Sequence, residues 1–231
     1  MTTPPAREKL EEWYDENYFR VYPRHDRRIR QILRNLSFSP SDKVCEFGCG
    51  LGHILFAIAP LIKNGLGLDF SEYAIAEAER RRQTAAIGDI SFEAIDIETL
   101  ASSAAHKGQF DKVLMMDISE HLYDDTLTRF LASAHHVLRA GGELYIHTPN
   151  AGYYLEKLKS RNILLKQFPS HIAVRGYRAY EAILLDAGFH VEKTIMLPHY
   201  NPVLGKIDML MKLPYVKHLF MSRILIKARI D

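Results

Sequence analysis

The stretch KVCEFGCGLGH, residues 43–53, decides the fold of this 231-residue chain. Its first five residues form a short apolar run that is typical of a buried strand, and residues 53–62, HILFAIAPLI, are typical of a helix. Between them Gly48, Gly50 and Gly52 stand at alternate positions, where the lack of a side chain lets the backbone turn tightly and approach a ligand. The stretch therefore predicts a strand, a ligand-binding loop and a helix.

Strand-like and helix-like stretches alternate through most of the remaining chain. Residues 223–230, RILIKARI, alternate with period two, and this pattern suits a last, antiparallel strand. The alternation as a whole predicts a largely parallel sheet covered by helices. The expected strands are 43–47, 65–69, 90–96, 110–117, 142–149, 190–197 and 223–230, and the expected helices are 53–62, 71–86, 126–140 and 177–189.

Composition is that of a folded cytoplasmic protein. The hydrophobic fraction of 47% and the charged fraction of 25% are ordinary for a globular domain. The first residues lack the apolar core of a signal peptide, and no apolar run of about 18 residues is present. Cys45 and Cys49 fall in a strand and its following loop, so they do not indicate a disulfide framework. We therefore expect a cytoplasmic protein that is neither secreted nor membrane-spanning.

We expect one domain over residues 1–231, with two helical additions. Residues 1–36 are expected to form a helical cap across the sheet, and residues 198–222 a helical insertion before the last strand. Residues 20–34 hold six arginines against one aspartate, and residues 205–231 hold six Lys/Arg against two aspartates. Such basic ends suit an anionic substrate, a phospholipid surface or RNA, and solvated helix faces are an equally good explanation.

Acidic residues follow three successive strands, at the edge where open α/β sheets bind ligands. Glu46 ends the first strand and can accept from an ammonium group. Asp69 ends the second strand, 21 residues after Gly48, where a carboxylate can hold both ribose hydroxyls. Asp96 ends the third strand and can accept from the exocyclic amine of adenine. Helix capping explains each residue singly, but three at one edge indicate a nucleoside that carries an amino acid.

A dinucleotide fits this loop poorly. It needs the pattern G-x-G-x-x-G, with the third glycine where the pyrophosphate meets the helix. Counted from Gly48 the third position is His53, and counted from Gly50 it is Leu55. The sequence therefore predicts that a nicotinamide cofactor does not bind.

These features together resemble the class I methyltransferases that use S-adenosylmethionine (SAM). The resemblance implies an α/β fold with a Rossmann-like seven-stranded sheet, mostly parallel with an antiparallel last strand, and helices on both faces. It also implies that SAM lies over the glycine loop, with its ribose at Asp69 and its adenine beside Asp96. The likeness is carried by residues 46–53, Asp69, Asp96, 110–117 and 138–150. The implied cofactor residues are Glu46, Phe47, Gly48, Cys49, Gly50, Gly52, Asp69, Phe70, Asp96, Ile97 and Asp117.

A second group of residues follows the fourth strand. Asp117, Glu120 and His121 lie close together in the sequence, and His171 comes in the loop beyond the fifth strand. The pattern resembles the ubiquinone-biosynthesis O-methyltransferases and the small-RNA 2′-O-methyltransferases, with Asp117 where glutamate is usual. In those families the group binds a divalent cation that holds and acidifies a substrate hydroxyl. The resemblance thus implies a metal site of Asp117, Glu120, His121 and His171.

Three roles stay open for this group. An alcohol is a poor nucleophile until it loses its proton, and Mg²⁺, Mn²⁺ or Zn²⁺ on mixed oxygen and imidazole ligands can act as the Lewis acid. Alternatively His121, assisted by Glu120, is itself the general base, since the ordinary histidine pKa of about 6.5 suits the task. The third role is structural or substrate-binding. His147 points to the same edge and is expected to be a core histidine.

The sequence therefore predicts a SAM-dependent O-methyltransferase for a hydroxyl of a small molecule. A sugar or a phenol, including one on a lipid-like carrier, is the leading substrate. RNA 2′-O-methylation is an alternative, although no interleaving of aromatic and basic residues predicts an RNA surface. A SAM-binding module without catalysis is a further alternative.

The two ends of the chain carry hypotheses about contacts. Tyr14, Tyr18 and Tyr22 have a spacing that places them on one helix face, and in related enzymes such a region closes over SAM. Packing on the sheet is the other explanation. Residues 203–221 are apolar with interspersed lysines, so they suit a peripheral membrane helix, a homodimer contact or a cap over the substrate.

Overall fold

The computed structural model describes most of the chain between Glu16 and Asp231. Parts of both predicted helical additions, namely 1–15, 22–25 and 211–216, lie outside the described residues, and Tyr14 and Tyr22 are among them. The described residues are 16–21, 26–160, 171–210 and 217–231.

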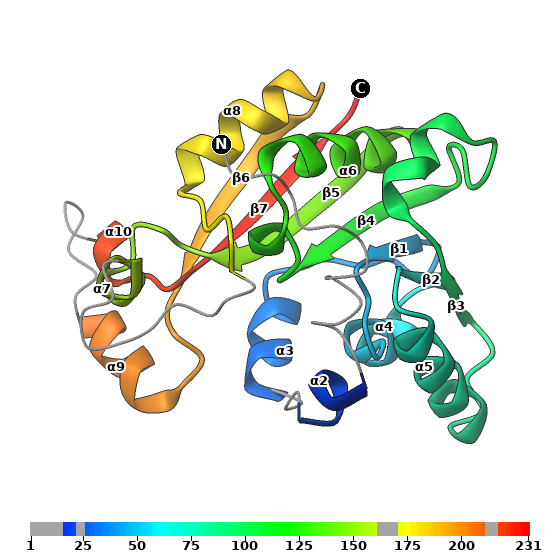
Figure 1. Ribbon diagram of the computed structural model, residues 1–231, viewed down its shortest axis with the longest axis horizontal. Coiled ribbons are helices and arrows are strands. Elements are labelled where there is room, and N and C mark those ends of the chain that lie inside the picture. The colour runs from blue at the N-terminus through cyan, green and yellow to red at the C-terminus, as the bar shows by residue number, and fades with distance from the viewer. Residues whose placement is uncertain (1–15, 22–25, 161–170, 211–216) are drawn as a thin grey trace.

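A single twisted sheet of seven strands organises the fold, in the order β3-β2-β1-β4-β5-β7-β6 (Figure 1). β7 pairs antiparallel with both β5 and β6, whereas the other pairs are parallel. The predicted mostly parallel sheet with an antiparallel last strand is confirmed. The strands are β1 (Lys43–Phe47), β2 (Asn64–Asp69), β3 (Ile90–Ala94), β4 (Phe110–Met116), β5 (Leu138–Pro149), β6 (His190–Leu197) and β7 (Arg223–Arg229).

Helices cover both faces of the sheet, as Figure 1 shows with α6 and α8 on one side and α3, α4 and α5 on the other. Period-two alternation along β1 separates the two cores, because Val44 packs in one cluster and its neighbour Cys45 in the other. In the same way Ile224 and Ile226 of β7 face a single core. The main helices are α3 (Asp26–Leu33), α4 (His53–Ile58), α5 (Glu72–Thr84), α6 (Asp124–Val137) and α8 (Tyr177–Asp186).

The boundary between α6 and β5 differs from the predicted one at residue 140. The helix ends at Val137, and Leu138 already pairs with Phe110 at the start of β5. The pairing then shifts register before Lys112, and Gly141 has a φ of 69°. The two glycines that were expected to stop the helix therefore bend the beginning of a longer strand instead.

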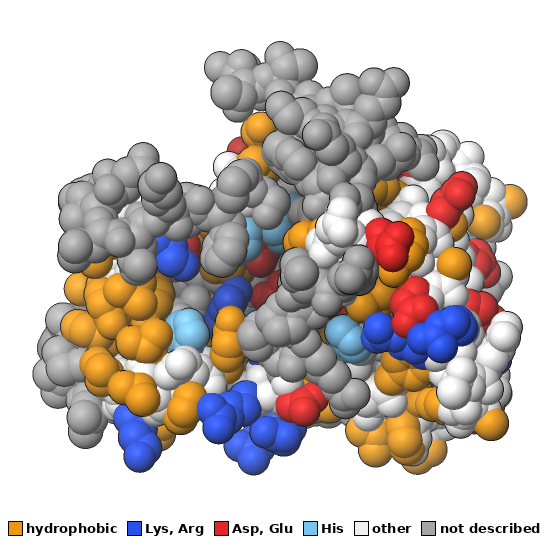
Figure 2. All heavy atoms as spheres, turned by 60° about the horizontal axis from the view of Figure 1, so that its bottom comes forward, with side chains coloured by type: hydrophobic (Ala, Val, Ile, Leu, Met, Phe, Trp, Pro, Cys, Tyr) orange, Lys and Arg blue, Asp and Glu red, His pale blue; other side chains and the backbone are white. Residues whose placement is uncertain are grey.

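Several shorter helices and 3₁₀ turns connect these main elements. α9 leaves Val203 66% exposed, Ile207 43% and Met209 52%, whereas Asp208 is buried and accepts from the His199 backbone N–H at 2.8 Å. Figure 2 shows the molecule with the bottom of Figure 1 turned forward. Apolar side chains gather at its left, the side on which α9 lies in Figure 1. Among the described residues, no helix is long and apolar enough to cross a membrane. The short helices are α2 (Glu16–Val21), α7 (Tyr154–Ser160), α9 (Pro202–Leu210), α10 (Lys217–Phe220) and the 3₁₀ turns η1 (Ala59–Leu61), η2 (Ile97–Ser102) and η3 (Ser119–His121).

Candidate active site

A cavity of about 290 Å³ opens at the carboxyl ends of β1, β2 and β4. Most residues that the sequence assigned to the cofactor line it, and Tyr18 of α2 does too. The sequence-predicted residues on its wall are Glu46, Gly48, Cys49, Gly50, Asp69, Phe70, Asp96, Ile97, Asp117 and His121.

Two predicted cofactor residues, Phe47 and Gly52, lie behind the cavity wall. Phe47 is fully buried and its ring lies 6.3 Å from that of Phe130, so it belongs to the core. Gly52 precedes α4 with a φ of 73°, and a Cβ there would come within 2.6 Å of the Phe92 ring. The Phe47 side chain therefore points into the core, and Gly52 is needed where the loop packs against Phe92.

The loop itself needs glycine for conformational reasons. Gly48 and Gly50 have φ values of 68° and 49°, in the left-handed region that other residues rarely adopt. The Gly48 and Cys49 backbone N–H groups both donate to the Leu68 carbonyl, at 2.8 and 3.1 Å. These bonds hold the loop against the end of β2, beside Asp69.

Glu46 offers a buried carboxylate oxygen to the cavity. The residue is only 3% exposed, and its Oε2 atom has no hydrogen-bond partner in the described structure. Burial raises the pKa of its carboxyl from 4.5 to about 8, and a hydrogen bond from the Leu55 backbone offsets this only in part. An orphaned acceptor at this position fits a cationic ammonium group such as that of SAM.

Asp69 joins the glycine loop to the helix that follows β2. Its Oδ2 accepts from the Gly50 backbone N–H at 2.8 Å, and its Oδ1 accepts from the Ser71 N–H at 3.0 Å. Burial raises its pKa, while these backbone donors lower it. Each carboxylate oxygen keeps capacity for another donor, so the residue can also accept from two ribose hydroxyls.

Asp96 lies two residues beyond the end of β3, which stops at Ala94 rather than at residue 96. Its side chain caps η2 by accepting from the Glu98 N–H at 3.1 Å. The capping role and a place on the cavity wall therefore coexist. Ile97, the next residue, is buried and its carbonyl accepts from Ser133 at 2.6 Å, which fixes this wall.

Asp117 does not join the predicted metal ligands. It has a φ of 56° at the end of β4, and its carboxylate is bound by Arg28 at 2.6 Å, His147 at 2.9 Å and Arg223 at 3.3 Å. These cationic and imidazole partners hold its pKa well below the usual range, although burial opposes them. Three other elements therefore engage the carboxylate of Asp117, and this residue is not part of the group that Glu120, His121 and His171 form. His147 is fully buried, as a core histidine is expected to be.

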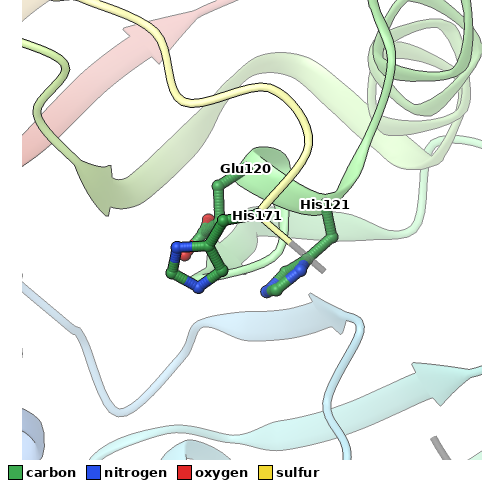
Figure 3. A group of neighbouring side chains, drawn as sticks. All are labelled: Glu120, His121 and His171. Atoms are coloured by element: carbon green, nitrogen blue, oxygen red, sulfur yellow. The ribbon is translucent and has the colours of Figure 1, made fainter. Parts of the chain in front are cut away.

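The remaining three residues come together beside the cavity. Glu120, His121 and His171 each offer a ligand atom, and these atoms all lie within 4.8 Å of one another. Figure 3 shows the two residues of η3 and His171, from the loop before α8, pointing to the same side. Thr148 donates to Glu120 at 3.2 Å. The two imidazole rings are 5.0 Å apart at their centroids.

Burial shifts the pKa values of two residues of this group in opposite directions. Burial, aided by nearby Asp117, raises the pKa of the Glu120 carboxyl above its usual range. Burial and the neighbouring His121 lower the pKa of His171 to about 3, so its ring is neutral near pH 7. A neutral imidazole has a lone pair to offer. Two imidazoles and a carboxylate suit a divalent cation of the first transition row or Mg²⁺.

Several site residues were not found from the sequence. Phe19, Arg28, Ile118 and Phe130 line the cavity, and Arg28 also holds Asp117. The one signal for Arg28 was its place in the basic segment 20–34. That signal did not indicate which acidic residue Arg28 would contact. The others are apolar residues that look like ordinary core residues in the sequence.

The sheet order, the glycine loop and the acidic strand ends define the class of SAM-dependent methyltransferases. A family model described as a methyltransferase domain matches residues 38–195. The chain belongs to this methyltransferase family and is an enzyme of that class.

Individual relatives agree. A ubiquinone biosynthesis O-methyltransferase of Thiobacillus denitrificans is 27% identical over 200 residues, covering 83% of each chain. A Mycolicibacterium smegmatis protein named as a probable SAM-dependent methyltransferase is 27% identical over 187 residues, and there the match spans 64% of the relative's length and 80% of this chain. Magnesium protoporphyrin IX methyltransferase from Synechocystis, solved with bound S-adenosylhomocysteine (SAH), has the same fold, with a TM-score of 0.68 at 19% identity over 98% of this chain and 100% of its own.

Proposed function

We propose that this methyltransferase transfers the methyl group of SAM to a hydroxyl of a small molecule, a phenol or a sugar, including one carried on a lipid. The observation that carries the proposal is the group Glu120, His121 and His171, assembled from two distant segments at the cavity. His121 itself lines that cavity, so the group borders the space assigned to the cofactor.

We assign the cofactor to the cavity residues through their chemistry. The unpartnered Glu46 oxygen would accept from the ammonium group, and Asp69 would accept from the ribose hydroxyls. Asp96 and Ile97 would border the adenine, as expected from their place on the wall. NAD is not expected to bind, because the loop lacks the third glycine.

Removal of a proton is the step that this group supports. An imidazole nitrogen of His121 would accept the proton of the substrate hydroxyl, and bound SAM would supply the methyl group to the hydroxyl oxygen and leave as the thioether. The products are a methyl ether and SAH. An amine attacks in its neutral form and needs no such base, so the presence of His121 on the cavity wall favours a hydroxyl substrate.

A divalent cation fits the same three residues. Its protein ligands would be Glu120, His121 and His171. Thr148 would orient the Glu120 carboxylate through its hydrogen bond. The cation would supply a Lewis acid that lowers the pKa of the hydroxyl. The relatives named as ubiquinone biosynthesis O-methyltransferases, at 27% identity, support methylation on oxygen.

The test is an acceptor comparison with SAM labelled in its methyl group. We expect label in the ether of a catechol or a glycoside, and none in the amine of matched aniline and amino-sugar acceptors. Transfer to the amines alone would overturn the proposal. Repeating the assay after exhaustive chelation and after addition of Mg²⁺, Mn²⁺ or Zn²⁺ separates the metal mechanism from direct base catalysis, since only the first needs the ion.

A further inference from the structure

Arg175 connects the loop that carries His171 to the turn that carries Glu120 and His121. Its guanidinium donates to the Ser119 carbonyl at 2.9 Å and to the Leu122 carbonyl at 2.7 Å, at the two ends of η3. The side chain is 7% exposed, so it is buried between the two segments. These bonds join residues more than 50 positions apart in the chain.

Two further contacts strengthen the connection. Arg175 donates from Nε and Nη2 to Asp124 Oδ1, at 2.8 and 2.5 Å, at the first residue of α6. In addition, the Ala173 backbone N–H donates to the Glu120 carbonyl at 3.0 Å. The carboxylate balances the buried positive charge, and the η3 carbonyls are partners that a short turn leaves available.

The geometry has a direct consequence for His171. It lies four residues before Arg175, and its ring is 5.0 Å from that of His121 only while the loop stays against η3. Within the described part of the loop, Arg175 donates side-chain hydrogen bonds that span the two segments. A guanidinium is needed, because a lysine ammonium cannot reach carbonyls and carboxylate in one plane.

We propose that Arg175 is a positioning residue, which holds His171 within ligand distance of Glu120 and His121 without itself touching the substrate. This inference rests on the proposed function for its catalytic meaning. Arg178 provides a matched control, since it lies on α8 three residues later, is exposed, and donates only to the Tyr177 hydroxyl, at 3.1 Å, among the contacts described.

The first measurement needs no substrate and no metal. In protein labelled with ¹³C-histidine, the nuclear Overhauser effect between the His121 and His171 rings reports their proximity. We expect this cross-peak in the wild type and in Arg178→Gln, and its loss in Arg175→Lys and Arg175→Gln. Both Arg175 variants should keep wild-type affinity for SAH, which shows that they are folded. A cross-peak that persists in Arg175→Gln overturns the proposal.

The second measurement uses Co²⁺ alone, followed by its visible absorption. We expect Arg175→Lys to weaken Co²⁺ binding by about 10–100-fold, as loss of a supporting contact does in metal sites, and Arg178→Gln to leave it unchanged. Equal affinity in Arg175→Lys and the wild type overturns the positioning role. If the wild type binds no Co²⁺, the metal part of the proposed function fails, and the ring cross-peak still decides the role of Arg175.

Discussion

The two sides of the cavity are built in different ways. On the cofactor side the carboxylate contacts are local, since Asp69 accepts from residues 19 and two positions away and Asp96 from a residue two positions away. On the side formed by the end of β4 they are distant, since Asp117 meets Arg28 across 89 positions and Arg223 across 106. The contacts on the cofactor side form within strand ends and their loops. The contacts of Asp117 form only after the whole sheet has assembled.

This difference predicts separable functions. Cofactor affinity should depend on residues of the glycine loop and β2, and chemistry should depend on residues that α8 and β4 bring together. Variants of one side should therefore leave the other side's measurement unchanged, and each prediction below tests this separation.

The largest effect is expected for His121→Ala. Loss of a general base or a metal ligand should lower kcat by about 10²–10⁴-fold, because such proton transfer contributes that much to a rate. SAH affinity, measured by calorimetry, should stay within error of the wild type. His190→Ala, whose side chain is 59% exposed on β6, is the control and should keep full activity. Weaker SAH binding by the His121 variant would break the comparison.

Asp69→Ala should show the reverse pattern. It removes two charge-assisted hydrogen bonds to ribose, roughly 1.5–3 kcal/mol each, so SAH affinity should fall by at least about 100-fold. Asp89→Ala removes an exposed aspartate just before β3 and should change nothing. An unchanged dissociation constant for Asp69→Ala would refute the cofactor assignment.

Glu46 gives the cofactor side a dependence on pH. Its folded pKa of about 8 exceeds the ordinary 4.5, so without cofactor the native state holds a proton that the unfolded chain has lost. Its contribution to stability therefore falls between about pH 4.5 and 8, by about 1.4 kcal/mol per pH unit. Urea unfolding should show Glu46→Gln gaining on the wild type as pH rises through this window.

Urea unfolding of the wild type and Glu46→Gln can also contradict this prediction. With SAH bound, the ligand's ammonium favours the charged carboxylate, so the advantage of the glutamine variant should shrink. A stability difference between the two that does not change with pH would show that Glu46 is ionised throughout, contrary to its burial.

The smallest effect concerns the exposed apolar face of α9. If its exposed face meets an anionic membrane, Val203→Ser combined with Ile207→Ser should reduce sedimentation with phosphatidylglycerol vesicles, and salt should weaken binding by the wild type. Leu185→Ser, at a 63% exposed position of α8, is the matched control. No vesicle binding by the wild type at low salt would instead favour a dimer contact or a substrate cap.

The sequence was most informative where structure is local. The limits of β1 match the predicted ones, and Glu46, Gly48, Gly50 and Asp69 do line one cavity, because strand ends in a parallel sheet meet at one edge. Local rules also explain the capping role of Asp96, which was expected as an alternative.

Longer-range contacts could not be predicted in this way. The motif pattern grouped Asp117 with Glu120 and His121, but α3, β5 and β7 bring three partners to its carboxylate instead. No spacing in the sequence shows that Arg28 and Arg223 will both contact Asp117. Similarly, the hydrogen bonds from Arg175 to the η3 carbonyls depend on how α8 packs. Nothing in the sequence of residues 119–122 indicates these bonds.

The place of β7 bears on how the chain is made. Among the described strands β7 comes last in the chain, yet it lies inside the sheet and joins β6 to the other strands. Translation must therefore deliver residues 223–229 before β6 can dock, whereas β1 to β4 can pair while the chain is still growing. Because Arg223 arrives with β7, the buried charge of Asp117 receives its last partner only when the ribosome has finished this strand.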